Sequence, residues 1–412
     1  MNARIHVAGT GVISAIGHSA AETMESFRQE RSGIGRISLF ETSYKDTLPV
    51  GEVKLSNAEL AGKVHSPQST VDGRKANAVT ASLPRTALLA IHAADEAIRQ
   101  AGLGDLKKWR TGLISGTTVG GMDRTEQFFA SFMSDTGKGH LRDVVNHECG
   151  KTAEIMAELF GITGFLSTIN TACSSSVNAI SYGARLITQG LLDVVVAGGT
   201  DALTKFTLNG FNSLMILDSA PCRPFDASRS GLNLGEGAGY VVLVSDRVLR
   251  ETGARSLGVV AGYANTNDAY HQTASSPEGR GSYAAMEKAL QLAGLTTGQI
   301  DYINLHGTGT LNNDLSEGTA VKRLFGDAIP RLSSTKAFTG HTLGASGGIE
   351  AVFSLLALQH QCVFPNLRFG EAMPELGIVP QTKFESGVRV QHVMSNSFGF
   401  GGNCSSIIFS QN

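Results

Sequence analysis

Charge of either sign is scarce in this sequence and nearly balanced. Charged residues make up 17% of the 412 residues, and 34 Lys and Arg stand against 36 Asp and Glu, which gives a net charge of -2. A chain so close to neutrality has no overall attraction to nucleic acid or to an anionic membrane surface. Hydrophobic residues reach 42%, so the composition is typical of a soluble chain with a large core.

Long apolar runs are also missing. No uninterrupted apolar stretch reaches about 18 residues, the length that a transmembrane helix needs. The first 14 residues, MNARIHVAGTGVIS, lack the basic segment and long apolar core of a signal peptide, and we expect them to form a first strand. The sequence therefore predicts a cytoplasmic protein that does not act at a membrane.

Cysteine is infrequent and its spacing is uninformative. The five cysteines are Cys149, Cys173, Cys222, Cys362 and Cys404. Their number is odd, and no two share the CxxC spacing of zinc and redox motifs. In a chain without an export signal we expect reduced thiols and no metal site.

Proline is scarce, at 10 residues, whereas glycine is abundant, at 49. The glycines follow short apolar runs, as in VAGTG at 7–11 and VAGGT at 196–200. This distribution suits closely packed strand ends and does not suit a low-complexity linker. Helical and strand patterns alternate along the chain, which predicts an α/β fold.

A weak internal repeat divides the chain into two halves, 1–250 and 251–412. The run HVAG at 6–9 is matched by VVAG in the second half, and in both halves a helix ending in AGL leads to a buried strand and a glycine turn. Convergence is the alternative, because such elements are common. Three matches in the same order favour duplication, and a site at the junction of the halves would draw residues from both.

Cys173 is the candidate nucleophile. It lies between an apolar-leaning run at 165–170, the expected strand, and a helix with one apolar face from Val177 to Ile187. Free N–H groups and the positive end of the helix dipole are expected to lower the pKa of this thiol from about 8.5. The alternative is an inert buried cysteine, which is how we interpret the other four.

Two of the 11 histidines lie in Gly-Thr loops beside regular elements. His306 opens the run HGTGT after a buried strand, and His341 lies in KAFTGHTLGA just before an apolar helix. A histidine in a loop is often only a surface or capping residue. Facing a helix-mounted cysteine, however, two neutral imidazoles can donate hydrogen bonds to one thioester carbonyl and stabilise an enolate as CO2 leaves.

Two further features lie close to these residues. Lys336 precedes His341 by five positions and would, in a pocket, orient a histidine or pair with Glu350; otherwise it is a surface cation. The tail contains SNSFGFGG at 395–402, a turn that offers a backbone N–H and a mobile aromatic side chain. A simple hairpin turn is the other interpretation of this tail.

Together these segments resemble the β-ketoacyl-acyl carrier protein synthases of the elongating type, which are condensing enzymes with the thiolase fold. The resemblance covers essentially the whole chain. Its motifs, in family order, are TACSSS (171–176), PFD (224–226), GEGAG (235–239), HGTGT (306–310), TGH (339–341) and NSFGFGG (396–402). The resemblance implies duplicated βαβ halves in a five-layered αβαβα arrangement, with the cysteine in the first half and both histidines in the second.

The resemblance also implies the chemistry. An acyl group would be held on Cys173 as a thioester and condensed with malonyl-acyl carrier protein, with loss of CO2, in fatty acid, polyketide or polyene biosynthesis. His306 and His341 would bind the malonyl thioester carbonyl. The backbone N–H groups of Cys173 and Phe400 would form the oxyanion hole, and Phe400 would gate the acyl pocket.

Supporting and partner roles are implied in the same way. Lys336 would hold the histidine network together with Glu350, and Asp314 and Glu317 would support the site. No metal or redox cofactor would be required, because the substrates are carried on the phosphopantetheine of acyl carrier protein. A homodimer is expected, with an apolar stretch after Gly116 in excess of what an exposed loop needs.

Carrier proteins are acidic, so a near-neutral enzyme needs a local basic rim to attract one. The candidate docking residues flank insertions of the first half near the expected entrance. They are Lys63, Arg74, Lys75 and Arg124.

The sequence departs from the family pattern at three places. Ser230 stands where an acidic residue is usual, Leu311 where a proline is usual, and Asn403-Cys404 where Thr-Asn is usual. None of these touches the cysteine or the histidines. The departures favour a pathway-dedicated synthase, such as those that build polyenes, over the standard enzyme of fatty acid elongation.

Three other functions are alternatives to this one. A thiolase needs a second catalytic cysteine, for which Cys404 is the only candidate, in surroundings that do not match. A non-catalytic chain-length partner subunit would resemble a synthase but would usually lack Cys173. Dinucleotide binding at Gly9-Thr10-Gly11 is excluded because Ser14 stands where the third glycine is required.

Overall fold

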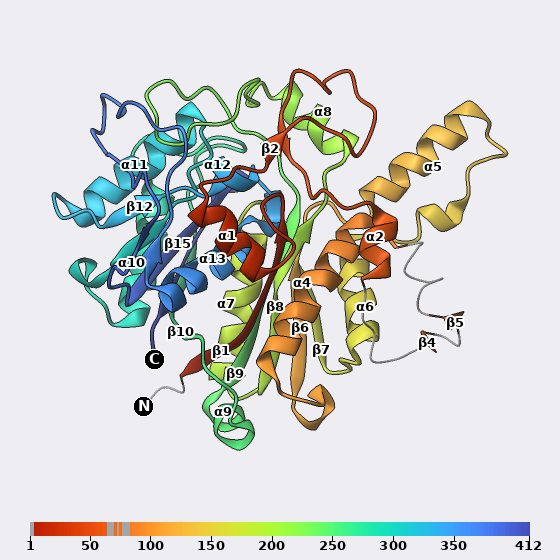
Figure 1. The fold of residues 1–412 in the computed structure, drawn as a ribbon, viewed down its shortest axis with the longest axis horizontal. Coiled ribbons are helices and arrows are strands. Elements are labelled where there is room, and N and C mark those ends of the chain that lie inside the picture. Colours follow the sequence, from red (N-terminus) through yellow and green to blue (C-terminus); the bar gives the residue numbers. More distant parts are fainter. Residues whose placement is uncertain (1–3, 64–69, 72–73, 76–82) are drawn as a thin grey trace.

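A ten-stranded mixed sheet runs through the computed structural model of the chain, which describes residues 4–63, 70–71, 74–75 and 83–412 (Figure 1). Each half contributes five neighbouring strands. The first half supplies β1 (Ile5–Ser14), β6 (Thr111–Gly116), β7 (Phe165–Ile169), β8 (Val194–Asp201) and β9 (Gly237–Ser245). The second half supplies β10 (Gly258–Asn267), β11 (Tyr302–Asn304), β12 (Arg331–Ser333), β15 (His392–Gly399) and β16 (Asn403–Ser410).

Strand order and orientation are the same in the two halves. Outward from the centre the first half runs β1-β9-β8-β6-β7 and the second β10-β16-β15-β11-β12. In each half the two outer pairings are parallel and the two inner ones antiparallel. The halves join where β1 pairs with β10, His6 opposite Val259. The predicted duplication is confirmed, and the predicted boundary at residue 250 falls in α9 (Asp246–Thr252), just before β10.

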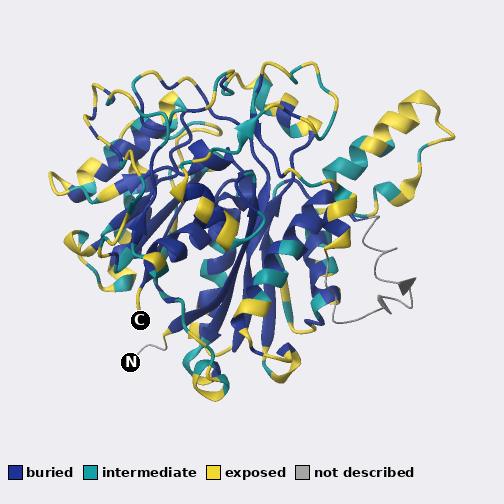
Figure 2. Ribbon diagram, viewed as in Figure 1, coloured by how far each residue is buried: buried dark blue, intermediate teal, exposed yellow. Residues whose placement is uncertain are grey.

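Helices cover the sheet on both sides and fill the space between its halves. The first half is covered outside by α4 (Arg85–Ala101) and α6 (Cys149–Phe160), and the second by α10 (Arg280–Ala293) and α11 (Leu311–Phe325). Between them α7 (Ser175–Thr188) and α13 (Ser346–His360) pack against each other and against strands. The result is the predicted five-layered αβαβα arrangement, in which the central strands β1, β8 and β9 and the middle helix α13 are almost entirely buried (Figure 2).

Glycines in the repeated apolar run let the outer helices approach the sheet closely. A Cβ atom added to Gly9 of β1 would lie 2.0 Å from the carbonyl oxygen of Ala97 in α4. A Cβ atom added to Gly262 of β10 would lie 2.2 Å from the carbonyl oxygen of Ala289 in α10. No side chain fits either gap. The glycine of the repeated run is therefore needed in both halves for the same reason, which is the close approach of a helix to a strand.

The remaining elements lie around this frame. The other helices are α1 (Ala20–Arg28), α2 (Asn57–Gly62), α5 (Met122–Ser134), α8 (Lys205–Ser213) and α12 (Lys336–Thr339). Short strand pairs are β2 (Ile34–Gly35) with β3 (Val50–Gly51), β4 (Thr70–Val71) with β5 (Arg74–Lys75), and β13 (Cys362–Val363) with β14 (Glu385–Ser386). Within the part of the chain that the structure describes, none of the helices combines the length and apolar character needed to span a bilayer.

A buried ion pair fastens several first-half segments together. Glu236, just before β9, accepts hydrogen bonds from Arg85 Nε at 2.8 Å and Nη2 at 2.7 Å, and the two side chains are 0% and 4% exposed. The same carboxylate accepts the backbone N–H of Val53 at 3.0 Å and that of Leu203 at 3.1 Å. One carboxylate therefore holds α4, β9 and two loops in place.

Removing this carboxylate should destabilise the fold strongly. Glu236→Ala leaves the buried guanidinium of Arg85 without its ionic partner, although carbonyl acceptors remain, and breaking a buried pair in this way typically costs about 3–5 kcal/mol of unfolding free energy. The matched control is Asp46→Ala, which breaks the exposed pair of Arg36 and Asp46, whose side chains are 64% and 70% exposed, and should change little. Urea unfolding of both variants measures the difference, and equal losses would contradict the role given to the buried pair.

Candidate active site

Cys173 lies where β7 leads into the middle helix α7. The helix begins at Ser175, two residues later, and Ala172 holds a left-handed φ of 52° that turns the chain. The end of β15 packs closely against this turn, because a Cβ atom on Gly399 would meet the backbone nitrogen of Cys173 at 2.9 Å. The predicted position between strand and helix is confirmed, and the cysteine is only 7% exposed.

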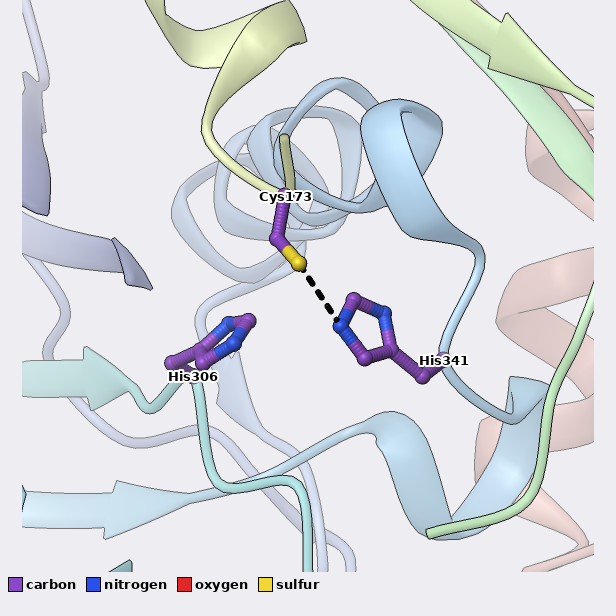
Figure 3. A group of neighbouring side chains, drawn as sticks. All are labelled: Cys173, His306 and His341. Carbon is purple, nitrogen blue, oxygen red and sulfur yellow. Dashed lines mark hydrogen bonds between the residues drawn. The ribbon is translucent and has the colours of Figure 1, made fainter. Parts of the chain in front are cut away.

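Two histidines from the second half converge on this thiol (Figure 3). His341, between α12 and α13, has its Nε2 atom 3.1 Å from Cys173 Sγ. His306 follows β11, and its ring packs edge-on against that of His341 with centroids 5.3 Å apart. The structure thus brings together the three residues that the sequence singled out, one from the first half and two from the second.

The hydrogen bonds around His341 fix which ring nitrogen carries the proton. The backbone N–H of Leu343 donates to Nδ1 at 3.2 Å, and Ser346 Oγ lies 3.0 Å from the same nitrogen. A nitrogen that accepts from an N–H group carries no proton, so the hydrogen of the neutral ring is on Nε2. That hydrogen points towards the sulfur of Cys173.

Burial keeps both imidazoles neutral. Desolvation lowers the pKa of His306 and His341 well below the ordinary 6.5, and the positive charge of Lys336 lowers both further. Neutral rings at physiological pH agree with the expectation from the sequence. They are suited to donate hydrogen bonds to a developing negative charge.

The expected fall in the pKa of Cys173 is wrong. Burial raises the pKa of this thiol to about 11, although the charge of Lys336 and the backbone N–H groups of Phe400 and Cys173 favour the thiolate. Loss of water outweighs the start of α7, because the helix terminus that was expected to stabilise the thiolate lies inside the protein. The same N–H groups are where an oxyanion hole was predicted.

Lys336 is buried and paired with Glu350, as one of the two interpretations of the sequence proposed. Its Nζ atom lies 2.5 Å from Glu350 Oε1, and the side chains are 1% and 4% exposed. Burial raises the pKa of Glu350 to about 7, while the neighbouring ammonium lowers it. The pair places a fixed positive charge beside the histidines without leaving it uncompensated.

Two buried carboxylates of α11 hold the loop that carries His306. Glu317 accepts the backbone N–H of His306 at 2.9 Å and that of Gly307 at 2.8 Å, and burial raises its pKa to about 7. Asp314 accepts the N–H of Gly309 at 3.2 Å and that of Phe225 at 2.8 Å. Burial raises the pKa of Asp314 as well. Asp314 and Glu317 therefore lie behind the site, in contact with the loop and not with the thiol.

A cavity of about 240 Å³ opens onto Cys173 and both histidines. Phe400, in the turn between β15 and β16, lines it and stacks on Phe211 of α8 with ring centroids 5.9 Å apart. Ser230 and Leu311, two of the three departures from the family pattern, also line it. A larger hollow of about 1130 Å³ between α5 and α8 includes no cysteine or histidine among the described residues that line it.

None of the four predicted docking residues is among the described residues that line this cavity. Lys63 is exposed at the end of α2. Arg124 lies on α5, where its Nη2 atom donates to the carbonyl of Leu83 at 2.9 Å. Arg74 and Lys75 form β5, and their side chains fall outside the described residues. A docking role for the four stays a prediction.

The thiol and the two imidazoles also resemble a metal-ligand set. Their sulfur and nitrogen atoms lie within 4.8 Å of one another, and all three residues are buried. Metal binding needs the lone pair of a ring nitrogen, whereas His341 Nε2 carries a hydrogen in the tautomer that Leu343 fixes. The hydrogen bonds therefore favour donation to a substrate over coordination of a metal.

Two contributors to the site were missed by sequence reasoning. Phe211 gives no signal of its own, since nothing in the chain places α8 against the tail. The N–H of Leu343 fixes the histidine tautomer. Leu343 has a left-handed φ of 52°, and no local sequence motif predicts this conformation. Only the three-dimensional arrangement identifies either of them.

The chain matches the models for "Beta-ketoacyl synthase, N-terminal domain" at residues 2–248 and "Beta-ketoacyl synthase, C-terminal domain" at residues 257–370. It is 34% identical over 423 residues to 3-oxoacyl-[acyl-carrier-protein] synthase 2 of Staphylococcus aureus strain N315, covering 99% of this chain and 98% of that protein. It is also 34% identical over 418 residues to nodulation protein E of Rhizobium meliloti, covering 100% of both.

Solved structures agree with these sequence matches. The ishigamide ketosynthase/chain length factor superposes with a TM-score of 0.92 at 28% sequence identity, covering 100% of both chains. The two matched domains meet close to the boundary between the duplicated halves, and each half brings part of the Cys173 pocket. By these matches over most of its length, the chain belongs to the beta-ketoacyl synthase family of condensing enzymes.

Proposed function

We propose that this chain is a cytoplasmic β-ketoacyl-acyl carrier protein synthase that carries an acyl group on Cys173 and condenses it with malonyl-acyl carrier protein. The observation that carries the proposal is the thiol 3.1 Å from the protonated Nε2 of a neutral histidine, with a second neutral histidine in the same pocket. In this proposal the chemistry requires no metal or redox cofactor, because each negative charge that develops on a substrate oxygen can accept hydrogen bonds from N–H groups of the protein.

The first half-reaction is acyl transfer to the thiol. After Cys173 loses its proton, its sulfur attacks the thioester carbonyl of the acyl carrier, and the bond from that carbonyl to the carrier sulfur breaks. The carrier leaves as a thiolate and takes up a proton. The backbone N–H groups of Cys173 and Phe400, both near the sulfur, would bind the oxyanion of the tetrahedral intermediate.

The second half-reaction is decarboxylation and condensation. His306 and His341 donate hydrogen bonds to the malonyl thioester carbonyl, so that when the bond to the carboxylate breaks and CO2 leaves, the electron pair is held as an enolate. The enolate carbon attacks the acyl carbonyl on Cys173 and expels the sulfur. Neither imidazole has to take up a proton, which suits rings whose pKa burial has lowered.

Two competing functions lose support from the same geometry. A non-catalytic partner subunit has no use for a thiol aligned with a histidine donor. A thiolase needs a second cysteine at the site, but Cys404 lies on β16 and is not among the described residues that line the cavity. Burial raises the pKa of Cys404 to about 12, which does not suit a base.

Acyl carrier protein is the proposed partner, and the name of the Staphylococcus aureus relative refers to this carrier. Such carriers are acidic, so exposed cations near the entrance would steer them with a strength that falls as salt rises. Lys63 is exposed, and Arg74, Lys75 and Arg124 remain candidates with it, although none of the four is among the described residues that line the cavity.

A homodimer is proposed through the free edge of the sheet at β7. In the described part of the chain β7 pairs only with β6, and its residues are partly or fully exposed, Leu166 by 40%. Unpaired strand edges with apolar side chains are usually covered. The predicted apolar stretch after Gly116 forms helix α5, which projects from the body (Figure 1) with Phe129 59% exposed. Both features favour a second copy at this side.

Cys173→Ala should abolish acyl loading without unfolding the protein, because alanine fits the buried position. Intact mass measurement after incubation with an acyl carrier substrate should show an adduct on the wild type and none on the variant. Cys404→Ala, which removes a buried thiol elsewhere, should load normally. An adduct at wild-type level on Cys173→Ala would refute the assignment of the nucleophile.

His306→Ala and His341→Ala should each accept an acyl group yet release CO2 from malonyl-acyl carrier protein slowly. Losing one donor to a developing oxyanion typically costs about 100–1,000-fold in rate. The control is His360→Ala, which removes an exposed histidine at the end of α13. Wild-type CO2 release from either site variant would show that the imidazoles do not stabilise the enolate.

Light scattering at micromolar concentration should give close to twice the 43.3 kDa mass of the chain. Leu166→Lys places a charge on the free edge of β7 and should shift the protein towards monomer. Leu292→Lys, at a position 55% exposed on α10, should leave the mass unchanged. A monomeric wild type would contradict the homodimer, and a dimeric Leu166→Lys variant would place the interface elsewhere.

A further inference from the structure

The turn that carries Phe400 is held by a neighbouring loop. We call residues 399–402 the gate turn and residues 268–276 the entrance loop. The N–H of Gly401 donates to the carbonyl of Gln272 at 2.7 Å, and the N–H of Asp268 donates to the carbonyl of Gly402 at 2.8 Å. Asn267, just before the entrance loop, donates from Nδ2 to the carbonyl of Gly401 at 2.9 Å. The position of the gate turn therefore depends on the position of the entrance loop.

The entrance loop has little core of its own. It contains no helix or strand, and most of its side chains are exposed. Asp268 closes the loop on itself by accepting the N–H of Ser276 at 2.6 Å and its hydroxyl at 2.7 Å. Its residues 273–275 line the cavity in front of Cys173. Segments with so few buried contacts take their position from a small number of hydrogen bonds.

Asn312, in the first turn of α11, supplies two of those bonds. Its Oδ1 atom accepts the N–H of Ser275 at 2.8 Å, and its Nδ2 atom donates to the carbonyl of Ser275 at 3.1 Å. One amide side chain thus holds both backbone groups of a single loop residue. Asn312 also lies close in sequence to His306. The segment 306–312 therefore carries the histidine at its start and, at its end, the amide that holds the entrance loop.

We propose that Asn312 is a positioning residue that keeps the Phe400 gate closed by clamping the entrance loop at Ser275. The closed position is the one observed, with Phe400 stacked on Phe211 beside the cavity. Opening the gate for an acyl chain requires the gate turn and the entrance loop to move together, because two backbone hydrogen bonds join them. Asn312 sets how readily they move. This inference rests on the proposed gate function of Phe400.

The test compares acylation of Cys173 by p-nitrophenyl octanoate and p-nitrophenyl acetate. In both reactions the thiol gives its proton to solvent, the sulfur attacks the ester carbonyl, the C–O bond breaks and p-nitrophenolate leaves with the electron pair, so release of the phenolate reports the rate. Only the octanoyl chain needs the gate open, and neither reagent carries a phosphopantetheine arm. The ratio of the octanoate rate to the acetate rate therefore measures gate opening.

Asn312→Ala should raise this ratio about five-fold, the factor expected when a net contribution of about 1 kcal/mol from hydrogen bonds is lost. Asn312→Asp keeps the acceptor for the N–H of Ser275 and should give an intermediate ratio. The matched control is Asn209→Ala on α8. Among the described residues its side-chain amide bonds only to the carbonyl of Lys205 in its own helix, so its loss should leave the ratio unchanged.

Phe400→Ala separates the two ways in which the idea can fail. If it raises the ratio while a folded Asn312→Ala variant does not, the gate exists and the clamp is refuted. If Phe400→Ala leaves the ratio unchanged, the gate itself is refuted, and the clamp with it. A thermal unfolding midpoint close to that of the wild type shows that Asn312→Ala is folded, and a partial return of the ratio in Asn312→Asp excludes a merely structural effect.

Discussion

Loss of water from the pocket raises the pKa of the catalytic thiol and lowers the pKa of both imidazoles at the site. Burial makes His306 and His341 neutral donors, and the same burial raises the pKa of Cys173 to about 11. An apolar pocket would then hold a thiol too weakly acidic to react. The charge of Lys336 and the nearby backbone N–H groups oppose this effect, and Lys336 can lie there only because Glu350 pairs with it. The buried ion pair and the donors are thus consequences of one constraint.

The duplicated fold explains why these groups meet. The two middle helices occupy equivalent places in the two halves, and each begins at the site: Cys173 lies two residues before α7, and His341 five residues before α13. His306 enters from the end of β11, a parallel strand of the second half. Residues far apart in the chain are therefore joined by symmetry-related elements whose separation is set by close packing, as Gly9 and Gly262 show for the outer layers.

Sequence patterns predicted the elements well because periodicity and glycine placement record local packing. The strand, turn and helix around Cys173 and the repeat of the two halves were all visible in the chain. The pKa of Cys173 could not be predicted, because the sequence indicates where a helix starts but not how deeply that start is buried in the protein. Phe211 was missed for a similar reason: its stacking on Phe400 joins α8 to the tail, and no local signal encodes a contact between segments so distant in sequence.

Two of the three departures from the family pattern, Ser230 and Leu311, lie at the surface, where change costs least, whereas Cys404 of the third is 2% exposed and packs in the core. The catalytic groups are tied into buried networks, in which Glu317 alone holds two backbone N–H groups and removal of one partner leaves others unsatisfied. Ser230 and Leu311 instead line the cavity from the surface, where Leu311 is 61% exposed, and Asn312 beside them bonds to an exposed loop. Substitutions there can alter what enters and how the gate moves while leaving the donors around Cys173 in place. The groups that take part in the reaction thus lie in the buried part of the pocket, and two of the residues that differ from the family pattern line its exposed part.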